Sequence, residues 1–217
     1  GALGTRGRLF SILAHINGSN HRALFGVRWR ADTALAVFTV NFTIRNIVLI
    51  GARGSGKSAV AHELSCLTSR AIVSTDAEAV QRAGCSIKEF VETHGWDLFR
   101  DLESEIVSDV ASRDAIIIDT GGGAILRQAN VDALRANGHV FWLRAPVAVL
   151  AERIKDDTQR PSLTGTKSFV HEIEEVLAVR TPLYMGAAHD IIDVEKDSPA
   201  EIAQIILRLF EREADSR

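Results

Sequence analysis

Cysteine, methionine and tyrosine are scarce in this chain, which has 217 residues but two cysteines, one methionine and one tyrosine. Two cysteines cannot build a disulfide framework, which excludes the class of small disulfide-stapled proteins. We expect Cys66 and Cys85 to be buried structural thiols. No apolar run approaches the roughly 18 residues that span a bilayer, so we expect no membrane-spanning segment. The 46% hydrophobic and 24% charged residues exclude wholesale disorder.

Lysine is also rare, because only five of the 25 basic residues are lysines. Arginine suits bidentate recognition of carboxylate and phosphate, but a GC-rich genome produces the same bias. Residues 1–45 hold six arginines against one acid, so this segment is +5 and the remainder of a chain of net charge −3 is −8. The seven histidines lack zinc-ligand spacing. No basic stripe beyond residue 45 favours a nucleic-acid partner.

Five short apolar runs alternate with segments of helical spacing, which predicts an α/β fold with a five-stranded parallel sheet flanked by helices. The runs are Ile47–Ile50, Ala71–Val73, Ala115–Ile118, His139–Leu143 and Asp190–Asp193. Helices are expected from Ser86, over Trp96–Val110, from near Asn130 to Gly138, from Pro146, over Phe169–Arg180 and from Ser198. Ligands of such sheets bind at the carboxyl ends of the strands.

A phosphate-loop motif, G-x-x-x-x-G-K-[ST], occupies Gly51–Ser58 directly after the first predicted strand. Its glycines let backbone N–H groups converge on an anion, and the start of the following helix adds partial positive charge. Lys57 can reach the β- and γ-phosphates, and the Ser58 hydroxyl can join a Mg²⁺ shell. The motif predicts a nucleoside triphosphate site without identifying an acceptor.

Five further stretches offer residues for an acceptor site, and each has a plainer interpretation. They are Ser74–Asp76, Phe99–Glu103, Gly121–Gly123, Arg160–Leu163 and Arg180–Tyr184. Asp76 has two interpretations: a base that orients a hydroxyl and accepts its proton, or a residue that caps a helix. Arg100 suits a carboxylate ligand, or a partner of Glu103 or Glu105. The glycines suit close approach to a ligand or a plain turn, and Arg160 lies in a polar stretch that suits a lid or an exposed loop.

Together these motifs resemble the shikimate kinase family, over about 170 residues from Asn46. The resemblance implies a three-layer P-loop kinase fold over residues 46–217, with a mobile lid at about 155–168. Residues 1–45 would be a poorly ordered N-terminal extension. It implies transfer of a phosphoryl group from ATP to the 3-hydroxyl of shikimate, with Mg²⁺ as cofactor, in aromatic amino acid biosynthesis.

The resemblance also assigns roles. Asp76, Lys57 and Arg160 would be catalytic, with Asp76 as the base and Arg160 closing over the phosphates. Arg100 and Arg180 would grip the shikimate carboxylate beside the glycine turn Gly121, Gly122 and Gly123. The implied ATP-binding set is Gly54, Ser55, Gly56, Lys57, Ser58, Ala59, Arg153, Arg160 and Pro199.

One position departs from the family pattern, because Ser74 stands where the family usually has the first aspartate of an Asp-x-Asp pair that supports Mg²⁺. Asp119 ends the third predicted strand, in the arrangement by which other P-loop enzymes hold Mg²⁺. We hypothesise that Asp119 replaces the missing carboxylate and shares the metal with Ser58. The alternative is that Asp119 caps the glycine turn.

The extension of residues 1–45 has three interpretations: a transit peptide, an interaction arm, or sequence upstream of the true start near Val40, since Met185 is the only methionine. We favour the third, and expect a cytoplasmic monomer, or a plastid protein if the extension is a transit peptide. Two functions remain as alternatives: another small-molecule P-loop kinase such as a gluconate kinase, and a non-catalytic regulatory relative.

Overall fold

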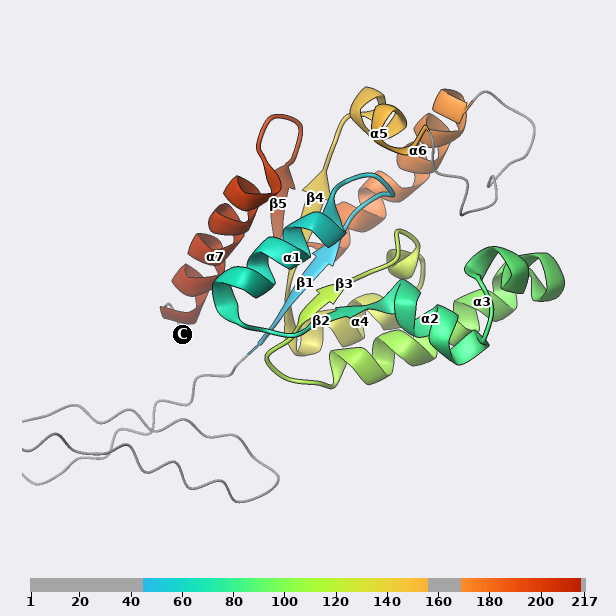
Figure 1. Ribbon diagram of the computed structural model, residues 1–217, viewed down its shortest axis with the longest axis horizontal. Helices are drawn as coiled ribbons and strands as arrows, with labels where there is room; N and C mark the ends of the chain where they lie inside the picture. The colour runs from blue at the N-terminus through green and yellow to red at the C-terminus, as the bar shows by residue number, and fades with distance from the viewer. Residues whose placement is uncertain (1–44, 156–168, 216–217) are drawn as a thin grey trace, which may run out of the picture. The chain divides into compact units, whose positions relative to one another are not determined.

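The computed structural model describes residues 45–155 and 169–215 of the chain (Figure 1). The predicted N-terminal extension through residue 44 therefore lies outside the described residues. So do Arg160 and nearly all of the predicted lid. Within the described ranges, no helix is long and apolar enough to cross a membrane.

A five-stranded parallel sheet forms the centre of the structure, as predicted, in the order β2-β3-β1-β4-β5. Its strands are β1 (Asn46–Ile50), β2 (Ile72–Ser74), β3 (Ile117–Asp119), β4 (Gly138–Arg144) and β5 (Asp190–Asp193). All five residues of β1 are buried, which explains why this strand reads as a continuous apolar run. The order brings the loops after β1, β2 and β3 together at one edge of the sheet.

Helices cover both faces of the sheet, which gives three layers (Figure 1). On one face, α1 and α7 pack against β1 through an apolar cluster that includes Val60, Leu64 and Ile206. On the other face, α3 and α4 build a second cluster, which also receives Tyr184 of α6. The helices are α1 (Lys57–Thr68), α2 (Thr75–Ala83), α3 (Ile87–Ala111), α4 (Gln128–Ala136), α5 (Val147–Ile154), α6 (Phe169–Ala187) and α7 (Pro199–Asp215), and Ala124–Leu126 form a 3₁₀ turn.

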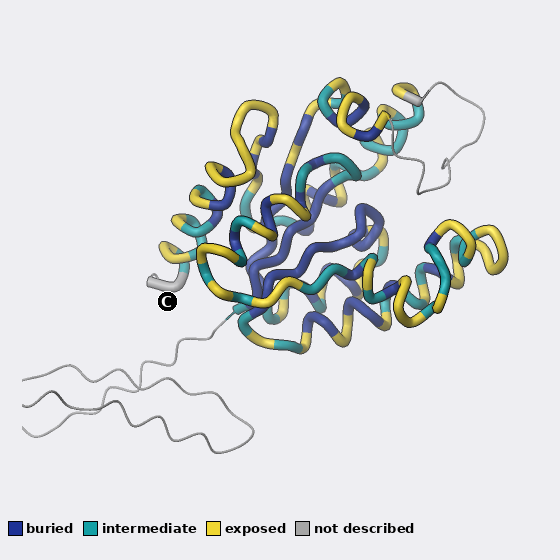
Figure 2. Tube along the Cα trace, viewed as in Figure 1, coloured by how far each residue is buried: buried dark blue, intermediate teal, exposed yellow. Residues whose placement is uncertain are grey.

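Burial follows these layers. In Figure 2 the strands β1, β3 and β4 are dark blue along most of their length, whereas α2 and the first part of α3 are largely exposed. Helix α3 is broken at Gly95, whose φ of 83° and ψ of 168° are not helical. The capping box of Ser86 and Glu89 starts the first part, and Trp96 starts the second. The sequence signals for these two helical segments are thus confirmed.

Two expectations were wrong. Cys66 is exposed and Cys85 half-buried, because Cys66 lies on the outward-facing surface of α1 and Cys85 follows α2, outside both cores. Helix α6 does not end at Arg180 but continues through Pro182 to Ala187. Buried Tyr184 and Ala187 pack into the core, and this packing outweighs the local cost of the proline. The expected end of α4 before Gly138 is confirmed, and Gly138 itself begins β4, where a Cβ would lie 2.6 Å from the Leu134 carbonyl oxygen.

Candidate active site

The phosphate loop connects β1 to α1 and has the backbone that only glycine adopts easily. Gly54 and Gly56 have φ values of 81° and 89°, and a Cβ on Gly54 would lie 2.7 Å from Ile154 Cγ2. Lys57 Nζ donates to the carbonyl oxygens of Gly51 and Ala52, both at 3.0 Å. The loop therefore curls around its own lysine at the N-terminus of α1, where partial positive charge favours an anion.

Ser58 and Asp119 meet beside this loop. The Ser58 hydroxyl donates to Asp119 Oδ2 at 2.6 Å, and the Asp119 side chain is largely buried. The Gly121 N–H donates to the Thr75 hydroxyl at 2.8 Å, so Thr75 and not Asp119 accepts the first N–H of the glycine turn. Ser74 is the parallel-register partner of Asp119 on the neighbouring strand β2. The Asp119 carboxylate thus lies one strand away from Ser74, whose side chain is uncharged.

A cleft of about 510 Å³ opens above these residues at the carboxyl ends of the strands. Its walls contain most of the predicted ATP-binding residues together with Asp76 and Asp119. The lining residues are Arg53, Gly54, Gly56, Lys57, Ser58, Ala59, Ser74, Asp76, Asp119, Thr120, Gly122 and Arg153. The predicted phosphate-binding and metal residues and Asp76, which the sequence placed on separate loops, therefore share one cavity, whereas Arg100, Gly121, Gly123 and Arg180 do not line it.

The glycine turn after β3 is enclosed on several sides. A Cβ on Gly121 would lie 2.5 Å from Asp76 Oδ1, and a Cβ on Gly123 would lie 2.6 Å from Arg100 Cζ. A Cβ on Gly122 would lie 3.5 Å from the backbone nitrogen of Arg53 in the phosphate loop. Gly121 and Gly123 therefore leave room for the Asp76 and Arg100 side chains that a Cβ would displace, whereas a Cβ on Gly122 would meet only ordinary van der Waals contacts.

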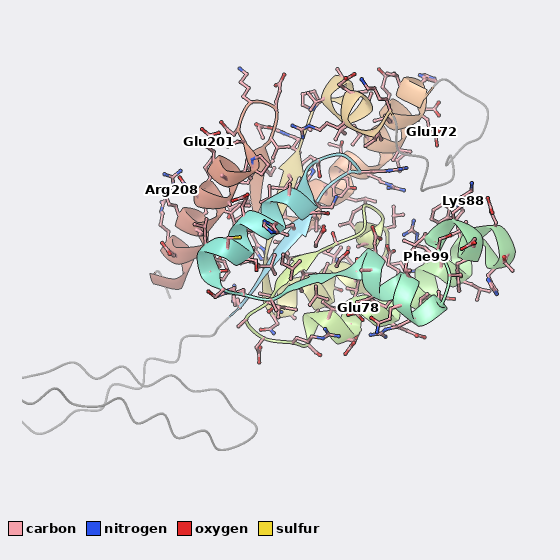
Figure 3. All side chains as sticks on the ribbon, viewed as in Figure 1. Glu78, Lys88, Phe99, Glu172, Glu201 and Arg208 are labelled. Atoms are coloured by element: carbon pink, nitrogen blue, oxygen red, sulfur yellow. The ribbon has the colours of Figure 1, made fainter. Side chains whose placement is uncertain are left out.

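Arg100 extends from α3, the helix that carries Phe99 in Figure 3, and is paired with a buried acid. Its Nη1 lies 2.6 Å from Glu103 Oε2, and its guanidinium lies 5.0 Å from the centre of the Trp96 ring. Burial raises the pKa of the Glu103 carboxyl, while the Arg100 guanidinium acts in the opposite direction. The predicted pairing of Arg100 with Glu103 is present, and it fixes the guanidinium beside Gly123.

Arg180 reaches the same turn from α6. Its Nη1 donates to the Gly122 carbonyl oxygen at 3.2 Å, and the hydroxyl of fully buried Tyr184 donates to the same oxygen at 2.6 Å. Burial raises the pKa of Tyr184 to about 12, so its hydroxyl stays protonated and able to donate. The two predicted carboxylate ligands, Arg100 and Arg180, thus converge on one glycine turn.

Comparison with known proteins identifies the fold family. A sequence model described as shikimate kinase matches residues 53–211. The chain belongs to the shikimate kinase family. It is 39% identical to shikimate kinase 2 of Syntrophotalea carbinolica over 173 residues, which are 78% of this chain and 99% of that protein. It is 42% identical to the shikimate kinase of Nitratidesulfovibrio vulgaris over 149 residues, 67% of this chain and 85% of that protein.

A solved structure agrees with this assignment. The shikimate kinase from Acinetobacter baumannii in complex with shikimate superposes with a TM-score of 0.75 and is 32% identical, covering 79% of this chain and 96% of that one. Membership in the shikimate kinase family confirms the resemblance inferred from the motifs and the P-loop kinase fold that it implies.

Six described members of the predicted site do not line the cleft of this shikimate kinase family protein: Ser55, Arg100, Gly121, Gly123, Arg180 and Pro199. Pro199 begins α7 and does not line it, whereas Arg153 does and donates to the carbonyl oxygens of Gly54 at 3.3 Å and Val194 at 3.1 Å. The side chain of Ser55 is buried under the loop, and among the described residues its hydroxyl has no hydrogen-bond partner.

Sequence reasoning assigned no role to several residues that build the site. Thr120 lines the cleft and donates to the Leu49 carbonyl oxygen at 2.8 Å, which fixes the end of β3 against β1. Ser74 accepts a hydrogen bond from the Ala77 N–H at 3.4 Å and so caps α2, which places Asp76 in the first helical turn. A serine before this helix and Gly84 after it are signals that could have revealed α2.

Proposed function

We propose that this protein transfers the γ-phosphoryl group of ATP to the 3-hydroxyl of shikimate. One observation carries the proposal: the Gly121–Gly123 turn contacts the phosphate loop on one side and Asp76, Arg100 and Arg180 on the other. An acceptor bound by these side chains would lie beside the phosphates, as in-line transfer requires. The related enzyme from Acinetobacter baumannii was solved in complex with shikimate, which supports this acceptor.

The phosphate side of the reaction rests on the loop before α1. Lys57 rests on two neutral backbone carbonyls, and an anionic phosphate is a stronger partner than a carbonyl for an ammonium group. We propose that Lys57 moves onto the phosphates and neutralises charge that develops during transfer. Arg160 would add a second positive charge, in keeping with the family resemblance.

Magnesium fits the residues at the floor of the cleft. Ser58 and Asp119 supply two oxygen donors 2.6 Å apart. The described residues hold no cluster of three or more histidine, cysteine or acidic side chains, which suits a metal bound mainly through phosphates and water. Bound Mg²⁺ would neutralise phosphate charge, and Ser58 and Asp119 would hold it.

On the acceptor side, we propose that Asp76 orients the hydroxyl and takes its proton while the oxygen bonds to the γ-phosphorus. The bond from that phosphorus to the bridging oxygen breaks, and ADP leaves with the electron pair. Arg100 and Arg180 present two guanidinium groups to the acceptor carboxylate, which is the anion that a planar fork binds best.

A coupled assay of ADP release tests this proposal with three acceptors: shikimate, gluconate and a nucleoside monophosphate. We expect turnover with shikimate and at most about one hundredth of that rate with the others, since the nucleoside monophosphate lacks a carboxylate and gluconate carries its carboxylate on a flexible open chain rather than on a ring. Turnover with gluconate alone would favour the alternative sugar-acid kinase. Tight ATP binding without turnover on any acceptor would favour a regulatory relative.

We also propose that the protein acts as a monomer, because the site is built from residues of one chain. A molecular mass of 23.6 kDa by light scattering is the expected result. An active species of twice that mass would contradict it.

A further inference from the structure

The Gly122 carbonyl is an unusual acceptor, because two side chains from one helix donate to it. Tyr184 and Arg180 are one helical turn apart on α6, so their side chains point toward the same spot. The shorter bond, 2.6 Å, comes from the tyrosine and the longer, 3.2 Å, from the arginine. Both donors therefore serve one oxygen atom in the centre of the proposed acceptor site.

The two donors differ in how freely their side chains can move. Tyr184 is fully buried, and its ring stacks on Trp142 of β4 with centroids 5.5 Å apart and an angle of 17°. Arg180 is only half-buried and is held to the turn by its longer bond. If Arg180 turns toward a carboxylate, the tyrosine hydroxyl remains as the donor to Gly122.

A donor must remain, because Gly122 is buried and a buried carbonyl without a partner is costly. Gly122 also lies against the phosphate loop, since a Cβ there would lie 3.4 Å from the Gly51 carbonyl oxygen, at ordinary van der Waals distance. The cost of releasing Arg180 thus depends on whether a second donor is in place.

We infer that Tyr184 is a positioning residue of the acceptor site, whose hydroxyl holds the Gly122 carbonyl so that Arg180 is free to leave it for the substrate carboxylate. This inference rests on the proposed function, because it assumes that Arg180 binds the acceptor. It assigns the single tyrosine of the chain a role in substrate affinity and none in the chemical step.

Tyr184→Phe tests the inference, since phenylalanine keeps the stacked ring and removes only the hydroxyl. Without the hydroxyl, Arg180 becomes the sole side-chain donor of the pair and is released at a cost. We expect the KM for shikimate, and its Kd by calorimetry without nucleotide, to rise roughly five- to thirtyfold. The kcat and the KM for ATP should change by less than about twofold.

Trp142→Phe is the matched control, because it weakens the stack and keeps the hydroxyl. It should lower the Tm and leave the shikimate KM unchanged. A double variant provides a second check: in an Arg180→Gln background, Tyr184→Phe should no longer weaken shikimate binding, since no arginine remains to be released.

Three results would overturn the inference. The first is an unchanged shikimate Kd in Tyr184→Phe, and the second is a loss of shikimate and ATP affinity in parallel with a lower Tm. The third is an equal loss of affinity with or without Arg180. If the wild-type protein binds shikimate but does not phosphorylate it, the proposed function fails and the calorimetric comparison still decides the inference. If it does not bind shikimate, both fail.

Discussion

The two edges of the sheet are the amino edge, where the strands begin, and the carboxyl edge, where they end. They differ in the partners of their polar side chains. At the edge where they begin, the His139 ring lies between two carboxylates, with Nε2 2.6 Å from Asp190 Oδ2 and Nδ1 facing Glu213. At the edge where they end, Lys57 and Arg180 donate to neutral backbone carbonyls.

This difference distinguishes side chains that stabilise the fold from side chains that can bind a ligand. A side chain paired with a carboxylate has a partner that few ligands can replace, whereas a cation on a carbonyl gains by moving to an anionic ligand. Arg100 and Arg144 are exceptions at the carboxyl edge, because the carboxylates of Glu103 and Asp193 hold them, and Arg70 is an exception at the amino edge, because it donates to the Arg45 carbonyl oxygen. We conclude that the carboxylates around His139 keep the amino edge as it is, whereas Lys57 and Arg180 at the carboxyl edge gain by exchanging a carbonyl for an anionic ligand.

The largest effect is expected for Lys57→Met, which keeps the aliphatic stem and removes the charge. We expect kcat/KM to fall by at least about a thousandfold in the coupled assay, because the phosphates lose their main cation. Arg45→Met at the other edge, which removes the 3.4 Å ion pair with Glu213, should leave kcat/KM within about twofold. Similar losses in both variants would break the comparison.

Asn46→Ala probes the amino edge. The fully buried Asn46 side chain donates to the Arg113 carbonyl at 2.6 Å and accepts from the Ile116 N–H at 3.1 Å, so its loss leaves buried groups unpaired. We expect the free energy of unfolding to fall by about 2 kcal/mol and the Tm by about 4–8 °C. Thermal melts and Michaelis constants check this together. A changed shikimate KM would mean that the two edges are coupled.

Asp119→Asn sharpens the assignment of the metal. Asparagine can still accept the Ser58 hydroxyl but carries no charge, so we expect the Mg²⁺ concentration for half-maximal activity to rise about tenfold. Asp132→Asn on the exposed side of α4 makes the same change of charge and should have no effect. An identical Mg²⁺ titration in both variants would rule out Asp119 as the substitute for the carboxylate absent at Ser74.

The smallest effect concerns pH. The pKa of Tyr184 is about 12 in the folded protein against 10.0 for a free side chain. The unfolded chain therefore releases this proton first, and the contribution of Tyr184 to stability is complete below pH 10 and is lost as the pH rises through 12. Relative to Tyr184→Phe, we expect the wild-type free energy of unfolding to fall by at most about 1.4 kcal/mol per pH unit across that window.

Urea unfolding of both proteins from pH 9 to 12 measures this difference, because every other titrating group is common to the two. Parallel curves would show that the tyrosine proton is not protected by folding. The hydroxyl would then be accessible to solvent rather than committed to Gly122.

Much of this architecture could be predicted from local sequence, because buried strands and phosphate loops have strong local signatures. The run Ile47–Ile50 with the following glycines is sufficient to place β1 and the loop. Helix α2 was missed because Thr75–Ala83 is short, with only Thr75 and Ala79 buried, and so has a weak apolar period. The continuation of α6 beyond Pro182 depends on tertiary packing, which local preference does not contain.

The site was predictable as a set of residues but not as a set of contacts. That Asp119 ends an apolar strand is visible in the sequence, whereas its register opposite Ser74 depends on β2 lying next to β3. The bond from Tyr184 to Gly122 joins residues 62 positions apart. No spacing rule reaches that far, so the role of the tyrosine had to come from the structure.

The strand order has a consequence for how the chain folds during its synthesis. The phosphate loop is made early, but β1 needs β3 and β4 as neighbours, and α1 packs against α7, which is synthesised long after it. A nascent chain on the ribosome thus contains the complete phosphate-loop motif long before the strands and helix that pack against the loop's flanking elements have been made. We expect nucleotide binding to develop late and abruptly, once α7 has left the exit tunnel.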